Sequence, residues 1–333
     1  MSYRNAGRFS RPQGSRSRFG GSGRPSGRRM PSANIHHSRY INTAVEPKEQ
    51  VEVPIRHTFA DFQLHTQLMK NITHHGYEQP TPIQDQAIPV MMEGKDVIGI
   101  ANTGTGKTAA FLIPLIERIA QDNEEGALII VPTRELATQI ADEFNMLAYN
   151  LRMGMILCVG GMSINAQIQG LRRNPHVVIG TPGRLKDLVK RNVLRTEMFT
   201  NIVLDEVDRM LDIGFVHDIK FLISTLPEDR KSYFFSATMN FEAEQIAHSF
   251  LRDPVKISVR TRETSVHIHQ DIVRVEVGQN KMDVLYQLLT QPDFERVIVF
   301  GRTKHGIDKL ERVLMDRGVK VSSIHGNKTQ GAR

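Results

Sequence analysis

Three acidic side chains, Asp205, Glu206 and Asp208, follow an apolar run at residues 201–204. Two adjacent acids at the end of a buried strand are unusual, because an unpaired buried charge is costly unless a partner or a metal ion offsets it. The acids could begin a helix, whose dipole favours carboxylates in the first turn. Alternatively, they could hold a cation and orient a water molecule, which would make the protein an enzyme.

A glycine-containing loop upstream offers a suitable partner for such a cation. The segment ANTGTGKT at residues 101–108 follows an apolar run and precedes a helical pattern. Gly104 and Gly106 allow the backbone to turn so that its N–H groups point at phosphate oxygens. Lys107 adds a positive charge, and the Thr108 hydroxyl can ligate Mg²⁺. The loop therefore predicts a nucleoside-triphosphate site.

The acids and the loop are expected at one edge of a single sheet. There Asp205 could hold the Mg²⁺ that bridges the β- and γ-phosphates, and Glu206 could orient or deprotonate the attacking water. The segment SAT, Ser236 to Thr238, also ends an apolar strand, and its hydroxyls could hydrogen-bond the acids.

Gln84 offers a donor and an acceptor from one amide, which suits the N6/N7 edge of adenine. Tyr77 and Phe59 could supply apolar or stacking surface beside it. From these residues alone, a capped helix start after Pro82 explains the segment better than a base-binding site.

Short apolar runs that alternate with helical patterns predict an α/β fold, a parallel sheet covered by helices on both faces. Strands are expected at residues 96–101, 127–132, 155–161, 176–182, 201–206 and 232–238. Helices are expected near 107–120, 134–147, 164–173, 183–191 and 241–250. Ligands of open α/β sheets bind at the carboxyl ends of the strands, where the polar motifs fall.

A second, shorter series follows a linker around residues 260–269. It predicts strands at 270–277, 296–300 and 319–326, and helices near 281–289 and 304–316. Because a parallel domain rarely has only three strands, we expect this second domain to be incomplete.

The net charge of +7 is concentrated in residues 1–45, which contain nine arginines and no acidic residue. Subtracting nine from +7 leaves −2 for residues 46–333. The Arg/Gly/Ser-rich composition predicts a disordered tail, whose arginines and phenylalanines suit phosphate contact and base stacking. A solubilising tail or a transit peptide are the alternatives, and we favour a nucleic-acid arm.

The single cysteine, Cys158, excludes an internal disulfide and fits a reducing compartment. Its place inside an apolar strand indicates a small buried hydrophobe rather than a nucleophile. No apolar run approaches the roughly 18 residues of a membrane span, and no signal-peptide core is present. We expect a soluble cytoplasmic protein that makes no membrane contact.

Taken together, the motifs resemble the DEAD-box family of ATP-dependent RNA helicases. In chain order they are Phe59, GYEQPTPIQ (76–84), ANTGTGKT (101–108), PTRELA (132–137), GG (160–161), TPGR (181–184), DEVD (205–208) and SAT (236–238). The resemblance covers about residues 57–333. It implies a P-loop, RecA-like ATP-binding domain at 57–260 and a partial second RecA-like domain at 270–333.

The resemblance also implies roles for single residues. ATP would be bound by Phe59, Tyr77, Gln84, Ala101, Asn102, Thr103, Gly104, Thr105, Gly106, Lys107 and Thr108. Mg²⁺ would be held by Thr108 and Asp205, and Glu206 would be the catalytic base. Hydrolysis would be coupled to RNA by Asp208, Ser236 and Thr238. RNA would be contacted, independently of its sequence, by Thr133, Arg134, Gly161, Thr181, Gly183 and Arg184. Protein partners are not implied.

Two departures from the family pattern affect this expectation. Val207 replaces an alanine at a position that would be buried, so crowding is possible. The second domain shows only the early family segments, without the later arginines that reach the γ-phosphate. We therefore expect this chain to bind ATP, to hydrolyse it poorly and not to unwind duplexes. A DNA-translocating helicase or other P-loop ATPase, and an ATP-gated RNA clamp, are the competing hypotheses.

Overall fold

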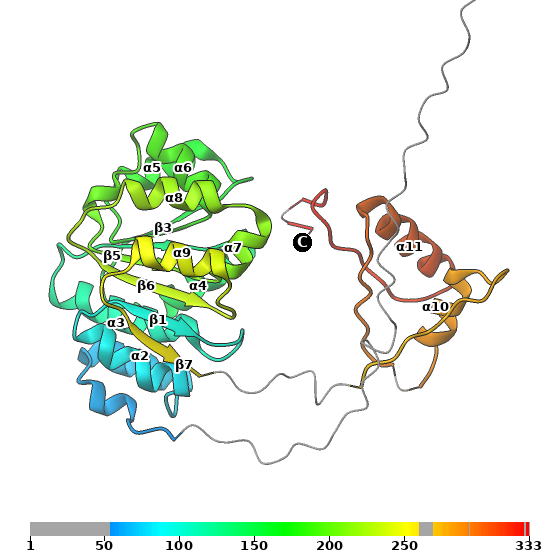
Figure 1. Cartoon of the computed structure of the whole chain (residues 1–333), viewed down its shortest axis with the longest axis horizontal. Helices are drawn as coiled ribbons and strands as arrows, with labels where there is room; N and C mark the ends of the chain where they lie inside the picture. The colour runs from blue at the N-terminus through cyan, green and yellow to red at the C-terminus, as the bar shows by residue number, and fades with distance from the viewer. Residues whose placement is uncertain (1–53, 260–268, 293, 330, 333) are drawn as a thin grey trace, which may run out of the picture.

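The computed structural model describes residues 54–259, 269–292, 294–329 and 331–332. Its main body is a seven-stranded sheet in the order β3-β4-β2-β5-β6-β1-β7, in which every pairing is parallel (Figure 1). The strands are β1 (Val97–Ile100), β2 (Ala127–Ile130), β3 (Met155–Cys158), β4 (Val177–Gly180), β5 (Asn201–Leu204), β6 (Lys231–Ser236) and β7 (Val255–Ser258). The α/β prediction is confirmed. The tail at 1–45 and the linker residues 260–268 lie outside the described residues.

Helices cover both faces of this sheet. One face carries α1 (Thr66–His74), α2 (Pro82–Met92), α3 (Lys107–Gln121) and α4 (Arg134–Leu147). The other carries α5 (Ile164–Leu171), α6 (Pro182–Lys190), α7 (Val207–Ile213), α8 (Val216–Ser224) and α9 (Phe241–Phe250). The short 3₁₀ helices are η2 (Phe59–Phe62) and η3 (Thr196–Met198).

Strand β2 shows why its sequence reads as a continuous apolar run. Its side chains alternate between the two faces, so Ile129 packs into one core while Leu128 and Ile130 pack into the other. When both faces of a strand are buried, the side chains on both faces are mostly apolar, so the sequence shows a continuous apolar run rather than an alternation of apolar and polar residues. The same holds for β4 and β5, and the apolar runs of the sequence located all three.

The strand order divides the carboxyl edge of the sheet into two halves. Strand β6 lies between β5 and β1, so the acids after β5, the SAT segment and the loop after β1 are neighbours. The loops after β2, β4 and β3 occupy the other half of the edge. Strands β2 and β5 are adjacent and join the two halves.

The prediction of strands after residue 269 is wrong. Residues 270–277, 296–300 and 319–326 form no strand beyond an isolated bridge at Gln270, although α10 (Lys281–Leu289) and α11 (Lys304–Asp316) form as expected. Parallel strands are stable where helices cover both faces. Here the apolar side chains of these segments stay uncovered, and Phe300 is 93% exposed. Of the described residues after 268, only Leu314 is buried.

No helix among the described residues is both long and apolar enough to cross a bilayer.

Cys158 ends β3 and is fully buried. Burial raises the pKa of its thiol to about 12, and the nearby positive charge of Arg184 opposes this only weakly. Because only the thiolate reacts, roughly one thiol in ten thousand is reactive at pH 8. We expect Ellman's reagent to leave the folded protein unmodified for hours and to titrate one thiol after denaturation. A fast reaction in native buffer would contradict the placement of β3.

Candidate functional site

The loop between β1 and α3 turns through two glycines in the left-handed region, Gly104 (φ +82°) and Gly106 (φ +89°). Gly106 caps α3, so the free N–H groups of the first helical turn face the loop. Lys107 is 6% exposed, and its Nζ donates to the Ala101 carbonyl at 2.8 Å. Thr105 Oγ1 donates to the Asn102 carbonyl at 2.8 Å. The result is a concave, cationic loop with inward N–H groups, which suits an anion.

Gln84 connects this loop to the start of α2. Its Oε1 accepts from the Thr81 backbone N–H at 2.9 Å, and its Nε2 donates to the Gly106 carbonyl at 3.0 Å. The first contact is the helix cap that the sequence favoured. The second contact places the same amide beside the glycine-containing loop. One side chain therefore caps α2 and also contacts this loop.

Phe59 and Tyr77 pack against each other. Their rings pack edge to face with centroids 6.1 Å apart, and Phe59 is 2% exposed. Phe59 thus offers no free ring face to a ligand. Tyr77 donates its hydroxyl to Glu143 Oε1 at 2.9 Å. Burial, followed by the charge of Glu143, raises the pKa of the Tyr77 hydroxyl above its ordinary value.

The acids lie directly beyond β5. Asp205 is 2% exposed and its Oδ1 accepts from the Glu206 N–H at 2.8 Å. Burial raises the pKa of Asp205 to about 6, while the positive charge of Lys107 and the Glu206 N–H oppose the rise. Glu206 caps α7 with left-handed backbone (φ 51°, ψ 50°), and its Oε2 accepts from Arg209 Nη1 at 3.1 Å. The acids therefore begin a helix. Asp205 also lies near enough to the loop for the charge of Lys107 to act on its pKa.

Asp208 joins the acidic segment to β6. Its Oδ2 accepts from the Thr238 N–H at 2.9 Å and from Thr238 Oγ1 at 2.8 Å. The Ser236 hydroxyl accepts from the Asp208 N–H at 3.2 Å and donates to the Thr238 carbonyl at 2.7 Å. Val207 between the acids is fully buried in the second core without disturbing these bonds.

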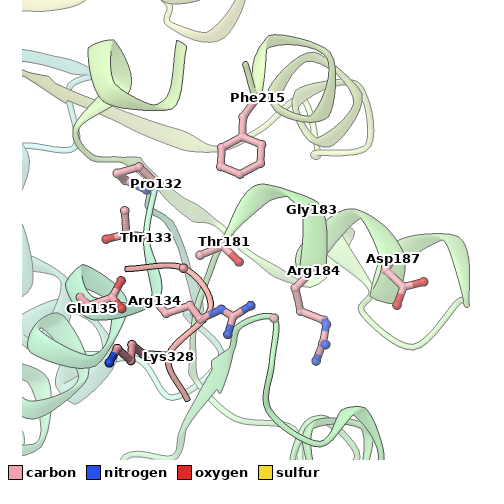
Figure 2. A pocket seen from close by; sticks show the side chains of 12 residues that line it. Pro132, Thr133, Arg134, Glu135, Thr181, Gly183, Arg184, Asp187, Phe215 and Lys328 are labelled. Atoms are coloured by element: carbon pink, nitrogen blue, oxygen red, sulfur yellow. The ribbon is translucent and has the colours of Figure 1, made fainter. Parts of the chain in front are cut away.

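A cavity of about 610 Å³ occupies the other half of the edge (Figure 2). Its lining comes from the loops after β2, β3 and β4, from the start of α8 and from the segment after α11. The residues are Pro132, Thr133, Arg134, Glu135, Gly160, Thr181, Gly183, Arg184, Asp187, Phe215, Gly326 and Lys328. Phe215 points into the space from the side opposite Arg134 (Figure 2). Among the ion pairs of the described residues, none involves Arg134 or Arg184.

Gly161 does not line the cavity, but its lack of a side chain leaves space for the Arg134 guanidinium. A Cβ built on Gly161 would lie 1.9 Å from Arg134 Nη1, and the residue has φ +76°. Only glycine combines this backbone with so close an approach. The Arg134 guanidinium therefore rests on the bare backbone after β3.

The comparisons with known proteins agree with this geometry. The family model described as DEAD/DEAH box helicase matches residues 81–246. A crystal structure of a DEAD box protein from the hyperthermophile Methanococcus jannaschii is 34% identical with a TM-score of 0.59, covering 83% of this chain and 74% of that one. The chain belongs to the DEAD-box helicase family.

Two curated DEAD-box relatives are closer in sequence. The DEAD-box ATP-dependent RNA helicase CshA of Bacillus licheniformis is 42% identical over 277 residues, 83% of this chain and 57% of the relative. The ATP-dependent RNA helicase CshA of Listeria monocytogenes is 43% identical over 277 residues, 83% of this chain and 53% of the relative. The chain thus spans about half the length of these relatives.

The site residues expected from the DEAD-box motifs fall into two groups. Gln84, Lys107 and Asp205 lie at the half of the edge formed by β5, β6 and β1. Phe59 lies in the core, where its ring packs against Tyr77. Of the six expected RNA contacts, five line the cavity and Gly161 seats Arg134.

Sequence reasoning missed Asp187 and Phe215, which also line the cavity of this DEAD-box chain. Asp187 lies one helical turn beyond Arg184, a spacing that would have placed both on one face of α6. Phe215 lies outside every motif, and we find no signal in the sequence that would have identified it.

We expect Gly106→Ala to destabilise the ligand-free protein more than Gly214→Ala. Both glycines have φ near +90°, where an alanine costs about 1–2 kcal/mol. A Cβ on Gly106 would also lie 2.5 Å from Gln84 Nε2, which is held by its own hydrogen bonds, whereas nothing lies within 4 Å of one on Gly214. Thermal unfolding of the two variants measures the difference. Equal melting temperatures would contradict the contact between Gln84 and the loop.

Proposed function

We propose that this chain is the ATP-binding part of an ATP-dependent RNA helicase, which couples ATP binding and hydrolysis to RNA binding and local duplex unwinding. One observation carries the proposal. A glycine-containing loop that carries Lys107 and a cavity lined by Arg134 and Arg184 share one sheet edge, and the paired strands β2 and β5 connect them.

The nucleotide would be ATP. The N–H groups of the first turn of α3 and the Lys107 ammonium would bind its phosphates, because both are strong donors for an anion. The Gln84 amide lies beside the loop and carries the donor and acceptor that an adenine edge needs. Tyr77 and Phe59 would keep the Gln84 segment in place.

Mg²⁺ fits the same residues. The described residues contain no cluster of three or more His, Cys, Asp or Glu that could chelate a metal by itself. The Thr108 hydroxyl and the Asp205 carboxylate are a small oxygen donor set, and Mg²⁺ commonly takes one or two protein oxygens together with phosphates and water. When bound, the ion would neutralise charge on the phosphates.

Glu206 would accept the proton of the attacking water. Glu206 is 9% exposed, and its carboxylate is held by Arg209, at the same edge as Lys107. Asp208 would transmit the state of this site to β6 through Ser236 and Thr238, since the three residues share direct hydrogen bonds.

The second half of the edge would bind single-stranded RNA. Arginine guanidinium groups, threonine hydroxyls and backbone N–H groups suit phosphates and 2′-hydroxyls, which gives binding independent of base sequence. Arg134, Arg184, Thr133, Thr181 and Gly183 supply these groups in the cavity. The Phe215 ring adds apolar surface against which a sugar or base could pack.

For the whole protein we propose two RecA-like lobes, the first at residues 57–260 and the second beginning at 270. Closing of the lobes around ATP would bend a bound RNA strand so that it no longer fits a duplex, and hydrolysis would reopen them.

Phosphate release by the whole protein, measured with and without RNA, tests this function. We expect single-stranded RNA, and not DNA of the same sequence, to stimulate the low basal rate. Glu206→Gln should abolish the stimulated rate, since general-base catalysis contributes about 10²–10⁴-fold. Asp212→Asn is a matched control, because Asp212 is an exposed acid on the same helix.

Equal stimulation by DNA would indicate a DNA-translocating helicase instead. A stimulated rate that survives Glu206→Gln would contradict the assigned proton acceptor.

A further inference from the structure

Gln167 is a buried polar side chain that lies outside the family motifs. It occupies the fourth position of α5 and is 3% exposed. A buried amide is costly unless its oxygen and nitrogen both find partners. Gln167 Oε1 accepts from Arg184 Nη1 at 2.8 Å, and Gln167 Nε2 donates to the Val159 carbonyl at 2.9 Å. Arg184 lies on α6 and lines the cavity, and Val159 directly precedes Gly160, another residue of the lining.

The contact with Arg184 fixes the direction of a guanidinium that lines the cavity (Figure 2). The same Nη1 also donates to the Met162 carbonyl at 3.3 Å. Both acceptors are neutral, so the guanidinium is oriented without losing its positive charge. A carboxylate in place of the amide would orient Arg184 equally well, but it would compete with a phosphate for the same cation.

The contact with Val159 reaches the other arginine. Val159 directly precedes Gly160 and Gly161, the two residues against which the Arg134 guanidinium rests. One side chain on α5 therefore holds the loop that seats Arg134 and the guanidinium of Arg184.

We propose that Gln167 is a positioning residue for RNA, a neutral amide that holds Arg184 in the cavity without cancelling its charge. This inference rests on the proposed RNA-binding function. Gln167 acts through Arg184 and touches no RNA itself.

The first test compares Gln167→Met with Gln169→Met. Gln169 is exposed on the same helix, so the control matches the residue type and the substitution. We expect Gln167→Met to weaken binding of labelled single-stranded RNA by about 3- to 10-fold, the net effect of one ordinary hydrogen bond. The control should bind like the wild type, and all three proteins should bind a fluorescent ATP analogue equally without RNA.

Gln167→Glu separates a positioning role from a packing role. The variant keeps the shape and the acceptor for Arg184, but it adds a negative charge and loses the donor to Val159. We expect its RNA affinity to fall at least as far as that of Gln167→Met. The slope of log affinity against log salt should shrink by about 0.7–0.9, the value of one neutralised phosphate contact. An unchanged slope and affinity would overturn the proposal.

A double-mutant cycle with Arg184→Met shows whether Gln167 acts through Arg184. We expect Gln167→Met to have a clearly smaller effect on RNA affinity once Arg184 is removed, because only its contact with the Val159 loop then remains to be lost. Fully additive effects would overturn the proposal, as would equal RNA affinity of the wild type and Gln167→Met. Thermal melts identify any variant that does not fold, and Gln167→Glu then carries the test. If the wild-type chain itself fails to bind RNA, the proposed function fails first and this inference with it.

Discussion

Two opposite charges buried at one edge of the sheet, Lys107 after β1 and Asp205 after β5, constrain the rest of the site. Burial alone would favour the protonated acid, and the attraction of Lys107 opposes this. Removing the positive charge of Lys107 would leave the buried carboxylate with less compensation and would raise the pKa of Asp205 further. The two residues are separated by the intervening strand β6, so the loops after β1 and β5 must hold both charges in place. The left-handed backbone at Gly106 and Glu206 belongs to those two loops.

The strand order turns this charge pair into part of a larger assembly. Strand β6 ends at Ser236 and Thr238 follows it, and Asp208 is hydrogen-bonded to both, so the acidic segment cannot move without affecting the end of β6. On its other side β5 pairs with β2, whose following loop presents Thr133 and Arg134 to the cavity. The half of the edge that carries Lys107 and Asp205 and the half that carries the cavity are thus joined through adjacent strands. This arrangement gives a physical route by which binding at one half could be felt at the other.

Much of this arrangement could be predicted from the sequence, for identifiable reasons. Strands buried on both faces leave continuous apolar runs, which located β2, β4 and β5. Strand β7 was missed because it is a half-exposed edge strand in which only Ile257 is buried. The strands after residue 269 were overpredicted, because an apolar pattern does not reveal whether neighbours cover it. At the site, ordered motifs identified Gln84, Lys107 and Asp205, whereas Gln167 gave no signal. Its role arises from two contacts with loops that only the folded chain brings together.

Calorimetric titration of ATP, with and without Mg²⁺, tests the central role of the buried charges most directly. The wild type should bind ATP more tightly when Mg²⁺ is present. Lys107→Ala should lose about 10- to 100-fold in affinity, the effect of one or two charge-assisted hydrogen bonds. Without Mg²⁺, Asp205→Asn should bind ATP as tightly as the wild type does. Adding Mg²⁺ should not tighten the binding of ATP to this variant. If Lys107→Ala bound ATP as tightly as the wild type and Asp205→Asn kept the Mg²⁺ dependence, the loop and the acids would not form one nucleotide site.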